Sequence, residues 1–257
     1  MHIEAIGFTA IVPGGAAAAV PGDSLQVKFG TKPRIMNVWC DYTGNGYVQI
    51  TFPTAHDTTR GWRNPVVASE VTNRMPMGFS MPLTPQEQMA INISSQGGSG
   101  NVENGVVLMA YDSMPGADQN LISWSDVLRR GYKMTTVQFV INPSSAGAWS
   151  GAEAINADSD LLLANRNYAL LGIELQNECC AISIKGPDTS GVRIAVPGST
   201  EFADQSANYF ALLSRAFGNA DTIPVINSAN KANTLLECLQ DGSLGAVTAS
   251  LQLVLLD

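Results

Sequence analysis

Alternating apolar and polar side chains are the first clear pattern in the chain, and they predict strands. In the segment 25–29 every second residue is apolar, which is typical of a strand with one face on a core. The runs 35–42 and 47–52 predict two more strands, and the pair Asn45-Gly46 between them is a favoured tight turn. We expect these two runs to form a hairpin with one face on the core of a β domain.

Similar elements follow in the same order, so the sequence predicts a tandem repeat of one β unit. The stretch that begins at Ile11 is echoed by the stretch that begins at Ile141. Three pairs of anchors give the offsets: Pro13 and Pro143 (143 − 13 = 130), Pro53 and Pro187 (187 − 53 = 134), and Asp112 and Asp257 (257 − 112 = 145). Slowly growing offsets are expected after duplication and insertion in turns, whereas chance similarity between β hairpins is the alternative.

The apolar positions between the anchors also agree. The matched positions are Met36, Val38 and Cys40 with Leu171, Ile173 and Leu175, then Val48 and Ile50 with Ile182 and Ile184, and finally the runs 106–111 with 251–256. We expect Val48 and Ile182 to face the cores of their respective units.

The repeat divides the chain into two domains and a connector. Residues 1–112 form the first unit and residues 132–257 the second. Residues 113–131 connect them and contain a short helix near 123–130, which Gly131 ends. The predicted fold class is all-β, with two tandem eight-stranded jelly-roll barrels or sandwiches, a short connector, and a helix inserted in the second.

That inserted helix is predicted over residues 201–217. Ser199 or Thr200 can serve as its N-cap, and Gly218 can follow its last turn. Five large apolar or aromatic side chains form a stripe along it: Phe202, Tyr209, Phe210, Leu213 and Phe217. A helix between two late strands of a β unit is a specific arrangement.

Composition and charge limit the classes of function that the chain can have. Only 14% of the residues are charged while 45% are apolar, which suits a subunit that buries much of its exterior, although a neutral polar surface is the alternative. The net charge is −8 and the chain has no Lys- or Arg-rich run, so we expect no direct binding to nucleic acid. No apolar run is long enough to span a bilayer, and the N-terminal residues do not form a signal peptide, so we expect synthesis in a cytoplasm with four free cysteines.

No residue set predicts catalysis, a cofactor or a metal. Of the two histidines, His56 is the candidate base, but the chain has no nucleophile elbow that would present a serine to it. The acidic pairs Asp158/Asp160 and Glu174/Glu178 show no sign of lying in a cleft. No phosphate loop or dinucleotide fingerprint occurs. We therefore expect a protein that is not an enzyme and that has no catalytic, cofactor or metal residues.

Tryptophans are the remaining candidates for a binding surface. Trp39 lies within a predicted strand and is better suited to a core. Trp62 and Trp149 lie in predicted loops and are candidates for protein contacts.

Two consecutive β units, a short connector and a helix late in the second unit resemble the double jelly-roll major capsid proteins of tailless icosahedral, membrane-containing bacteriophages. The resemblance covers nearly the whole chain and rests on architecture, repeat and composition, not on a diagnostic motif. It implies a major capsid subunit that forms pseudo-hexagonal homotrimers, which tile an icosahedral shell in the virion after assembly in the host cytoplasm. The implied partners are copies of the chain, neighbouring trimers, other capsid or vertex proteins, and an internal membrane.

Carried onto this chain, the resemblance makes the turns 42–47 and 176–180 equivalent and places the inserted helix between subunits. The expected interface residues are Trp62, Trp149, Phe202, Tyr209, Phe210 and Phe217.

Two other classes stay open. A carbohydrate- or receptor-binding β-sandwich, such as a spike, fibre or lectin-like module, would bind a glycan through loop aromatics such as Trp62 or Trp149. A β-sandwich glycan hydrolase or lyase is disfavoured because the chain lacks a catalytic set.

Overall fold

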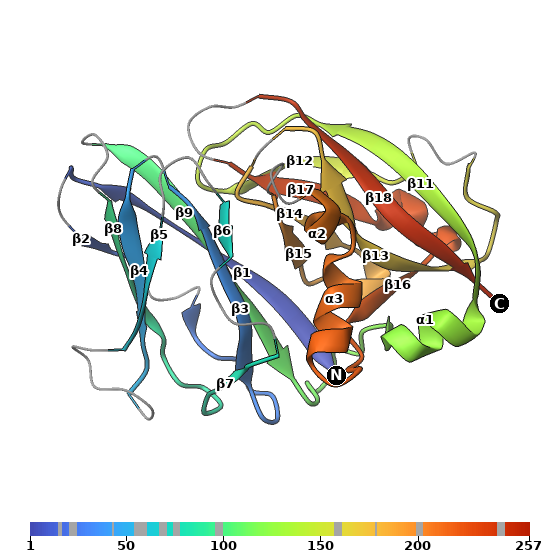
Figure 1. The fold of residues 1–257 in the computed structure, drawn as a ribbon, viewed down its shortest axis with the longest axis horizontal. Helices are drawn as coiled ribbons and strands as arrows, with labels where there is room; N and C mark the ends of the chain where they lie inside the picture. The colour runs from blue at the N-terminus through green and yellow to red at the C-terminus, as the bar shows by residue number, and fades with distance from the viewer. Residues whose placement is uncertain are drawn as a thin grey trace.

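In the computed structural model the chain is mostly β, with four antiparallel sheets and a few short helices (Figure 1). The structure describes residues 1–14, 17–20, 25–42, 44–53, 61–66, 71–73, 78–95, 100–156, 161–177, 179–198, 203–240 and 245–257. This architecture is consistent with the predicted all-β, jelly-roll type of fold.

Two sheets form the first part of the chain. The first sheet has the order β1 (His2–Val12), β9 (Asn101–Tyr111), β3 (Arg34–Asp41) and β6 (Val71–Asn73), and β7 (Met81–Pro82) also pairs with β3. The second sheet has the order β2 (Ala17–Ala19), β8 (Ala90–Ser95), β4 (Gly46–Thr51) and β5 (Trp62–Val66). The hairpin predicted for the runs 35–42 and 47–52 is therefore wrong, because β3 and β4 lie in different sheets and pair with other strands. The strand predicted over 25–29 is also wrong, because this segment forms only an isolated bridge between Gln26 and Gln88 and Phe29 is exposed.

Two further sheets form the second part. One has the order β11 (Gly131–Ile141), β18 (Val247–Leu256), β13 (Asn167–Leu175), β16 (Ile223–Asn227) and β10 (Leu121–Ile122). The other has the order β12 (Trp149–Ala154), β17 (Leu235–Leu239), β14 (Ala181–Lys185) and β15 (Ile194–Pro197). The helix α1 (Trp124–Arg130) precedes β11, and its N-cap Ser123 accepts a hydrogen bond from the backbone of Asp126.

The strand order is the same in both parts. Reading across the sheets, β1-β9-β3-β6 corresponds to β11-β18-β13-β16, and β2-β8-β4-β5 corresponds to β12-β17-β14-β15. The sequence order of the strands is the same as well, apart from the added β7 and β10. We call the two parts the first and second unit.

The register of the strands supports the same correspondence. In β3 the pairing with β9 shifts at Met36, and in β13 the pairing with β18 shifts at Leu171, so each strand carries a bulge at the residue that the sequence comparison had matched. Val48 on β4 and Ile182 on β14 are both fully buried in apolar cores, as predicted.

The first anchor of the repeat is wrong by one residue. When the bulges of β3 and β13 are superimposed, Leu108 on β9 corresponds to Gln252 on β18 (252 − 108 = 144). Ala5 pairs with Leu108 and Thr136 pairs with Gln252, so Ala5 corresponds to Thr136. The offset between the first strands of the two units is therefore 131 (136 − 5) instead of 130.

Exposure shows why the match between Ile11 and Ile141 fails. Ile11 is 67% exposed, whereas Ile141 is completely buried. A slip of one residue along a strand moves a side chain to the opposite face, so these two isoleucines are not equivalent. The last anchor, Asp112 with Asp257, is likewise one residue out of register.

The helix predicted over 201–217 is two helices, α2 (Ala203–Ala207) and α3 (Tyr209–Ala216). They are separated at Asn208, whose backbone lies at φ −121° and ψ 17° and whose side-chain amide donates to the carbonyl of Asp204 at 3.1 Å. A side chain that bonds the local backbone in this way competes with the regular helix. Gly218 follows α3 at φ +69°, as predicted for the residue after the last turn.

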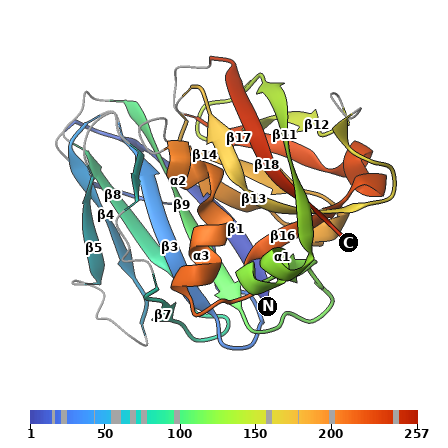
Figure 2. The same cartoon turned by 45° about the vertical axis from the view of Figure 1, so that its right-hand side comes forward.

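The second unit covers the outer face of β1, β9 and β3. Side chains on this face belong to the same apolar cluster as the interior of the second unit: Ile3, Ala5, Trp39, Val106, Leu108 and Ala110. The opposite face of these strands lines a separate core within the first unit. Figures 1 and 2 show α2 and α3 between β3 and the sheets of the second unit.

Three hydrogen bonds fix this junction. The indole nitrogen of Trp39 donates to the carbonyl of Cys180 at 3.0 Å, and the amide nitrogen of Asn37 donates to the hydroxyl of Tyr209 at 2.8 Å. The backbone N–H of Ala5 donates to the carbonyl of Arg193 at 2.8 Å. The rings of Trp39 and Tyr209 also meet edge to face, with centroids 5.9 Å apart.

We expect Tyr209→Phe to lower the free energy of unfolding by about 1–3 kcal/mol, because Asn37 loses its buried acceptor. Chemical denaturation monitored by fluorescence and circular dichroism measures the change. Tyr132→Phe is the matched control, since Tyr132 is 62% exposed and should tolerate the same deletion. Equal stability of the two variants would show that the bond does not hold the junction.

Candidate functional site

The aromatic residues predicted to form an interface do not gather in one place. Trp62 on β5 is half-buried and packs against the core of the first unit, while Phe217 is half-buried against the second. Phe202 lies outside the described residues. A contact with other copies of the chain stays a prediction for Trp62, Trp149, Phe202 and Phe217.

Tyr209, Phe210 and Trp149 make contacts within the chain. Tyr209 and Phe210 are buried at the junction, so they leave no surface for another copy. Trp149 lies against β1, where a Cβ on Gly7 would come within 2.7 Å of the indole nitrogen. The guanidinium carbon of Arg193 lies 5.8 Å from the centroid of the Trp149 ring, and Arg193 also pairs with Glu237.

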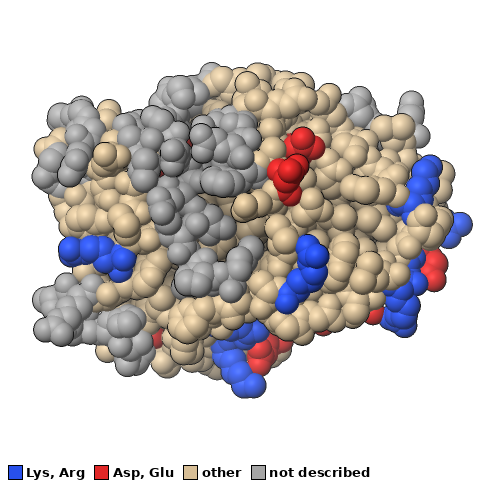
Figure 3. Space-filling view, viewed as in Figure 1, with Lys and Arg blue, Asp and Glu red and all other residues tan. Residues whose placement is uncertain are grey.

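The described surface has few charges. On the face in Figure 3, Lys, Arg, Asp and Glu side chains are scattered and most described atoms belong to uncharged residues. Four large apolar side chains on α1 and β11 are exposed: Leu128, Tyr132, Met134 and Val140. Exposed apolar side chains that share an element indicate a contact surface.

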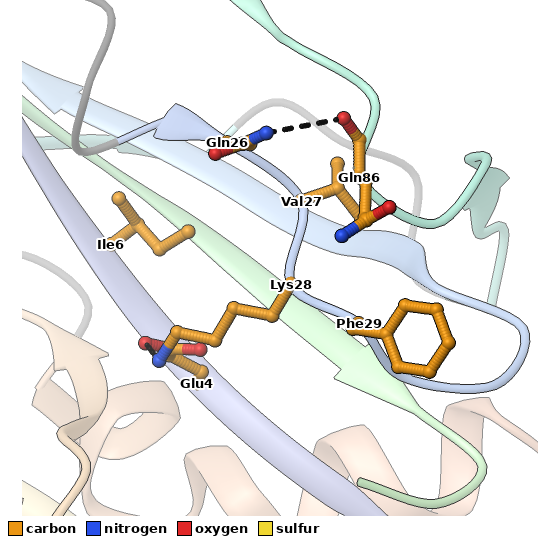
Figure 4. A pocket seen from close by; sticks show the side chains of 7 residues that line it. All are labelled: Glu4, Ile6, Gln26, Val27, Lys28, Phe29 and Gln86. Carbon is orange, nitrogen blue, oxygen red and sulfur yellow. Dashed lines mark hydrogen bonds and ion pairs between the residues drawn. The ribbon is translucent and has the colours of Figure 1, made fainter.

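A cavity of about 380 Å³ opens beside β1 in the first unit. Its walls come from β1, from the segment 26–29 and from Gln86, as Figure 4 shows. Phe29 is 70% exposed at its rim, while Glu4 and Lys28 form an ion pair on its other side. A cavity of this size, with one aromatic ring and several polar groups, is suitable for a small polar ligand.

Two features set this cavity apart from an ordinary surface hollow. The Oε2 atom of Glu4 is buried without a hydrogen-bond partner, although Oε1 is paired with Lys28. Gln86 has a left-handed backbone, with φ +64°, and its carbonyl accepts a hydrogen bond from the side chain of Gln26. Unsatisfied buried atoms and strained backbones are more frequent at binding sites than elsewhere.

His2 lies two residues from Glu4 on the same strand, and its ring contacts Tyr111 edge to face, with centroids 5.8 Å apart. Nδ1 lies 3.1 Å from the carbonyl oxygen of Ala117, while Nε2 is buried without a partner. Burial lowers the pKa of His2 below the ordinary value of 6.5, and the hydrogen bond to Ala117 opposes that shift. The imidazole is therefore neutral at neutral pH.

All four cysteines are free and buried, as predicted. Burial raises the pKa of the Cys40 and Cys180 thiols well above their ordinary range and that of Cys238 to about 11. The thiols are therefore protonated and poor nucleophiles.

Within the described residues, no group of His, Cys, Asp and Glu is arranged to hold a metal ion. The candidate groups His56, Asp158, Asp160 and Glu178 lie outside the described part of the chain. Glu174 is described, and its carboxylate accepts a hydrogen bond from Gln252 at 3.1 Å. No described helix is both long and apolar enough to cross a bilayer.

Comparison with known proteins leaves the family open. No family model and no curated protein sequence matches the chain. The weakly similar solved structures include PBSX exported protein XepA (12% identity, 98% of this chain and 86% of that one, TM-score 0.30), the major capsid protein of bacteriophage PM2 (9%, 100% and 98%, 0.25), and a cupin 2 conserved barrel domain protein from Leptotrichia buccalis (8%, 100% and 84%, 0.22). Since these TM-scores are low, the conclusions below rest on the structure of this chain.

The sequence alone does not predict the cavity residues. One local feature of the sequence points to a site on β1: His2 and Glu4 are polar, although they lie on the face of the strand that also carries Ile6 and Phe8. Lys28, Phe29 and Gln86 come from two other segments, which only the folded chain brings together.

We expect the stability of the protein to fall as the pH drops through about 6.5. The pKa of His2 is lower in the folded state, so the unfolded state binds more protons in this range and is favoured by acid. Urea unfolding measured from pH 8 to pH 5.5 tests this. His2→Leu should flatten the profile, whereas the same change at the other histidine, His56, shows how much of the slope belongs to His2. An unchanged slope in His2→Leu would contradict the prediction.

Proposed function

We propose that the protein is a viral structural protein, the major capsid subunit of a tailless icosahedral bacteriophage. Each unit is interpreted as one jelly roll, so the chain contributes two similar blocks to a pseudo-hexagonal homotrimer. Its partners are then copies of itself, neighbouring trimers, other capsid or vertex proteins and an internal membrane. It acts in the virion without catalysis and without direct contact with nucleic acid.

The observation that carries this proposal is the repeated strand order. The order β1-β9-β3-β6 facing β2-β8-β4-β5 is that of two interlocked Greek keys, and the second unit repeats it. Eight-stranded jelly rolls of this kind are common in viral capsids, lectins and cupins. A chain with two of them in tandem suits a tiling subunit, because one gene product supplies two neighbouring blocks.

The packing between the units also favours a tiling role. The outer face of β1, β9 and β3 lies against the second unit, so a face of one block meets a different surface of the next. Contacts of this kind are heterologous, and they can be repeated to form rings and sheets. The low charge of the described surface is compatible with repeated lateral contacts.

We expect purified protein to form trimers of about three times 27.2 kDa and, near physiological salt, sheets or shells. Multi-angle light scattering gives the mass, and negative-stain electron microscopy shows the assemblies. Raising the protein concentration at constant salt separates mass-action assembly from precipitation. A strictly monomeric protein at every concentration would contradict the capsid proposal.

The cavity beside β1 favours a second candidate, a carbohydrate- or receptor-binding module. Phe29 offers an exposed ring for stacking on the apolar face of a sugar, and Glu4 offers an unpaired acceptor for a hydroxyl. Lectin domains also use the jelly-roll architecture.

We expect any sugar bound in this cavity to be lost on Phe29→Ala. Binding is measured on a glycan array and then by titration calorimetry with the best neutral mono- or disaccharide. Phe79→Ala is the matched control, since Phe79 is 57% exposed and lies outside the cavity. Absence of binding by the native protein, or binding that survives Phe29→Ala, would remove the support of the cavity for this candidate.

A further inference from the structure

Two hydrogen bonds anchor the backbone of the cavity wall that carries Lys28 and Phe29. The backbone N–H of Val27 donates to the carbonyl of Glu87 at 2.9 Å. The backbone N–H of Lys28 donates to the hydroxyl of the buried Tyr111 at 3.2 Å. The backbone of this wall is therefore held in place, while the side chains of Lys28 and Phe29 reach solvent.

Strand β1 contributes a carboxylate that is only half satisfied. Oε1 of Glu4 is paired with the ammonium of Lys28, whose side chain extends over the carboxylate in Figure 4. Oε2 of Glu4 is buried and has no hydrogen-bond partner. His2, two residues away, supplies no donor to it, because its Nδ1 atom lies against the carbonyl of Ala117 and its Nε2 atom is itself without a partner. A buried carboxylate oxygen that lacks a donor is costly, so a donor brought by a ligand stabilises it.

Glu4 and Lys28 make the cavity neutral overall but dipolar. They are the two charged side chains among the described residues that line it. A ligand with one net charge is attracted by one of these groups and repelled by the other, whereas a zwitterion complements both. The Lys28 side chain is 44% exposed, so its ammonium can turn toward a ligand carboxylate and uncover Glu4 while the anchored backbone stays in place. Ion pairs open to solvent contribute little to stability, so this exchange of partners costs little.

The remaining walls suit an aromatic group on that zwitterion. Ile6 and Val27, which belong to the core of the first unit, line the cavity, and the exposed ring of Phe29 lies at its rim. An aromatic ring of the ligand can stack on Phe29 while its edge contacts the two aliphatic side chains. The volume of about 380 Å³ is near the lower end of the range for ligand pockets, so the ligand is small.

We propose that the cavity beside β1 binds a small zwitterion, a free α-amino acid with an aromatic side chain. The ammonium of the ligand pairs with Glu4, its carboxylate with Lys28, and its ring packs on Phe29. The site lies within the first unit of one chain, so the inference does not depend on the capsid proposal. It names a different ligand from the saccharide candidate, because a neutral saccharide has no charges to complement the pair of Glu4 and Lys28.

A ligand series on the native chain tests the proposal without any variant. Titration calorimetry compares phenylalanine with phenylpropionate, which lacks the ammonium, and with phenethylamine, which lacks the carboxylate. Phenylalanine should bind, and each analogue should bind about tenfold more weakly, because one charge-assisted hydrogen bond is lost. Equal affinities for the three compounds would overturn the inference. So would the absence of binding of phenylalanine, tyrosine and tryptophan in the millimolar range, whether or not a neutral saccharide binds.

Two variants locate the bound amino acid. Lys28→Met and Phe29→Ala change side chains that reach solvent, and circular dichroism and thermal unfolding verify that the fold is kept. Each should weaken the binding of phenylalanine about tenfold. Lys32→Met is the matched control, because the Lys32 side chain is 81% exposed and pairs with Asp112 outside the cavity, and it should bind like the native chain. Native affinity in Lys28→Met, or an equal loss in Lys32→Met, would contradict the proposed site.

Discussion

The rest of the structure depends on the burial of one sheet face by a neighbouring unit. The outer face of β1, β9 and β3 is as apolar as a core, and it would be a large exposed patch if the first unit stood alone. Because a sandwich already has one core between its sheets, this second apolar face makes the first unit dependent on the second. The bonds from Trp39 and Asn37 then select one orientation among those that would cover the same area.

This constraint explains the helices between the units. Two sheets that pack face to face leave a wedge at the side where their twists diverge. The segment α2–α3 fills the space beside β3 and β13, and it supplies Tyr209, which bonds the first unit while its neighbour Phe210 packs in the second. A straight helix over the same residues would place these side chains differently, so the break at Asn208 belongs to the junction.

The sequence predicted most of the strands and the repeat because both depend on local patterning, but the segment 25–29 is not a strand, and β3 and β4 form no hairpin because they lie in different sheets. Alternation placed Val48 and Ile182 on the cores, and the match of Met36 with Leu171 held even though both are bulge residues. The failures concern information that local patterning lacks. Ile11 and Ile141 looked equivalent in a motif, but only the pairing of β1 and β11 with their neighbours shows that they face opposite sides.

The site was harder to predict for the same reason. The sequence places Tyr209 at a contact between copies because it lies on an aromatic stripe. Such a stripe predicts that the side chains are buried, but it does not identify the surface that buries them. The covering surface turned out to belong to the same chain. The cavity depended on three separate segments, and the polar His2 and Glu4 on an otherwise apolar strand face were the single local trace of it.

The two equivalent outer faces differ in polarity because one is covered within the chain and the other is partly open to water. Where the first unit has Ala5, Leu108 and Trp39, the second has Thr136, Gln252 and Glu174, which form a continuous hydrogen-bonded row across β11, β18 and β13. A face that is covered as the chain folds can be wholly apolar. On the second unit the row is only partly open to water, because Thr136 and Glu174 are exposed while Gln252 between them is 8% exposed. The side-chain amide of Gln252 accepts from Thr136 and donates to Glu174, so the hydrogen bonds within the row compensate for its burial.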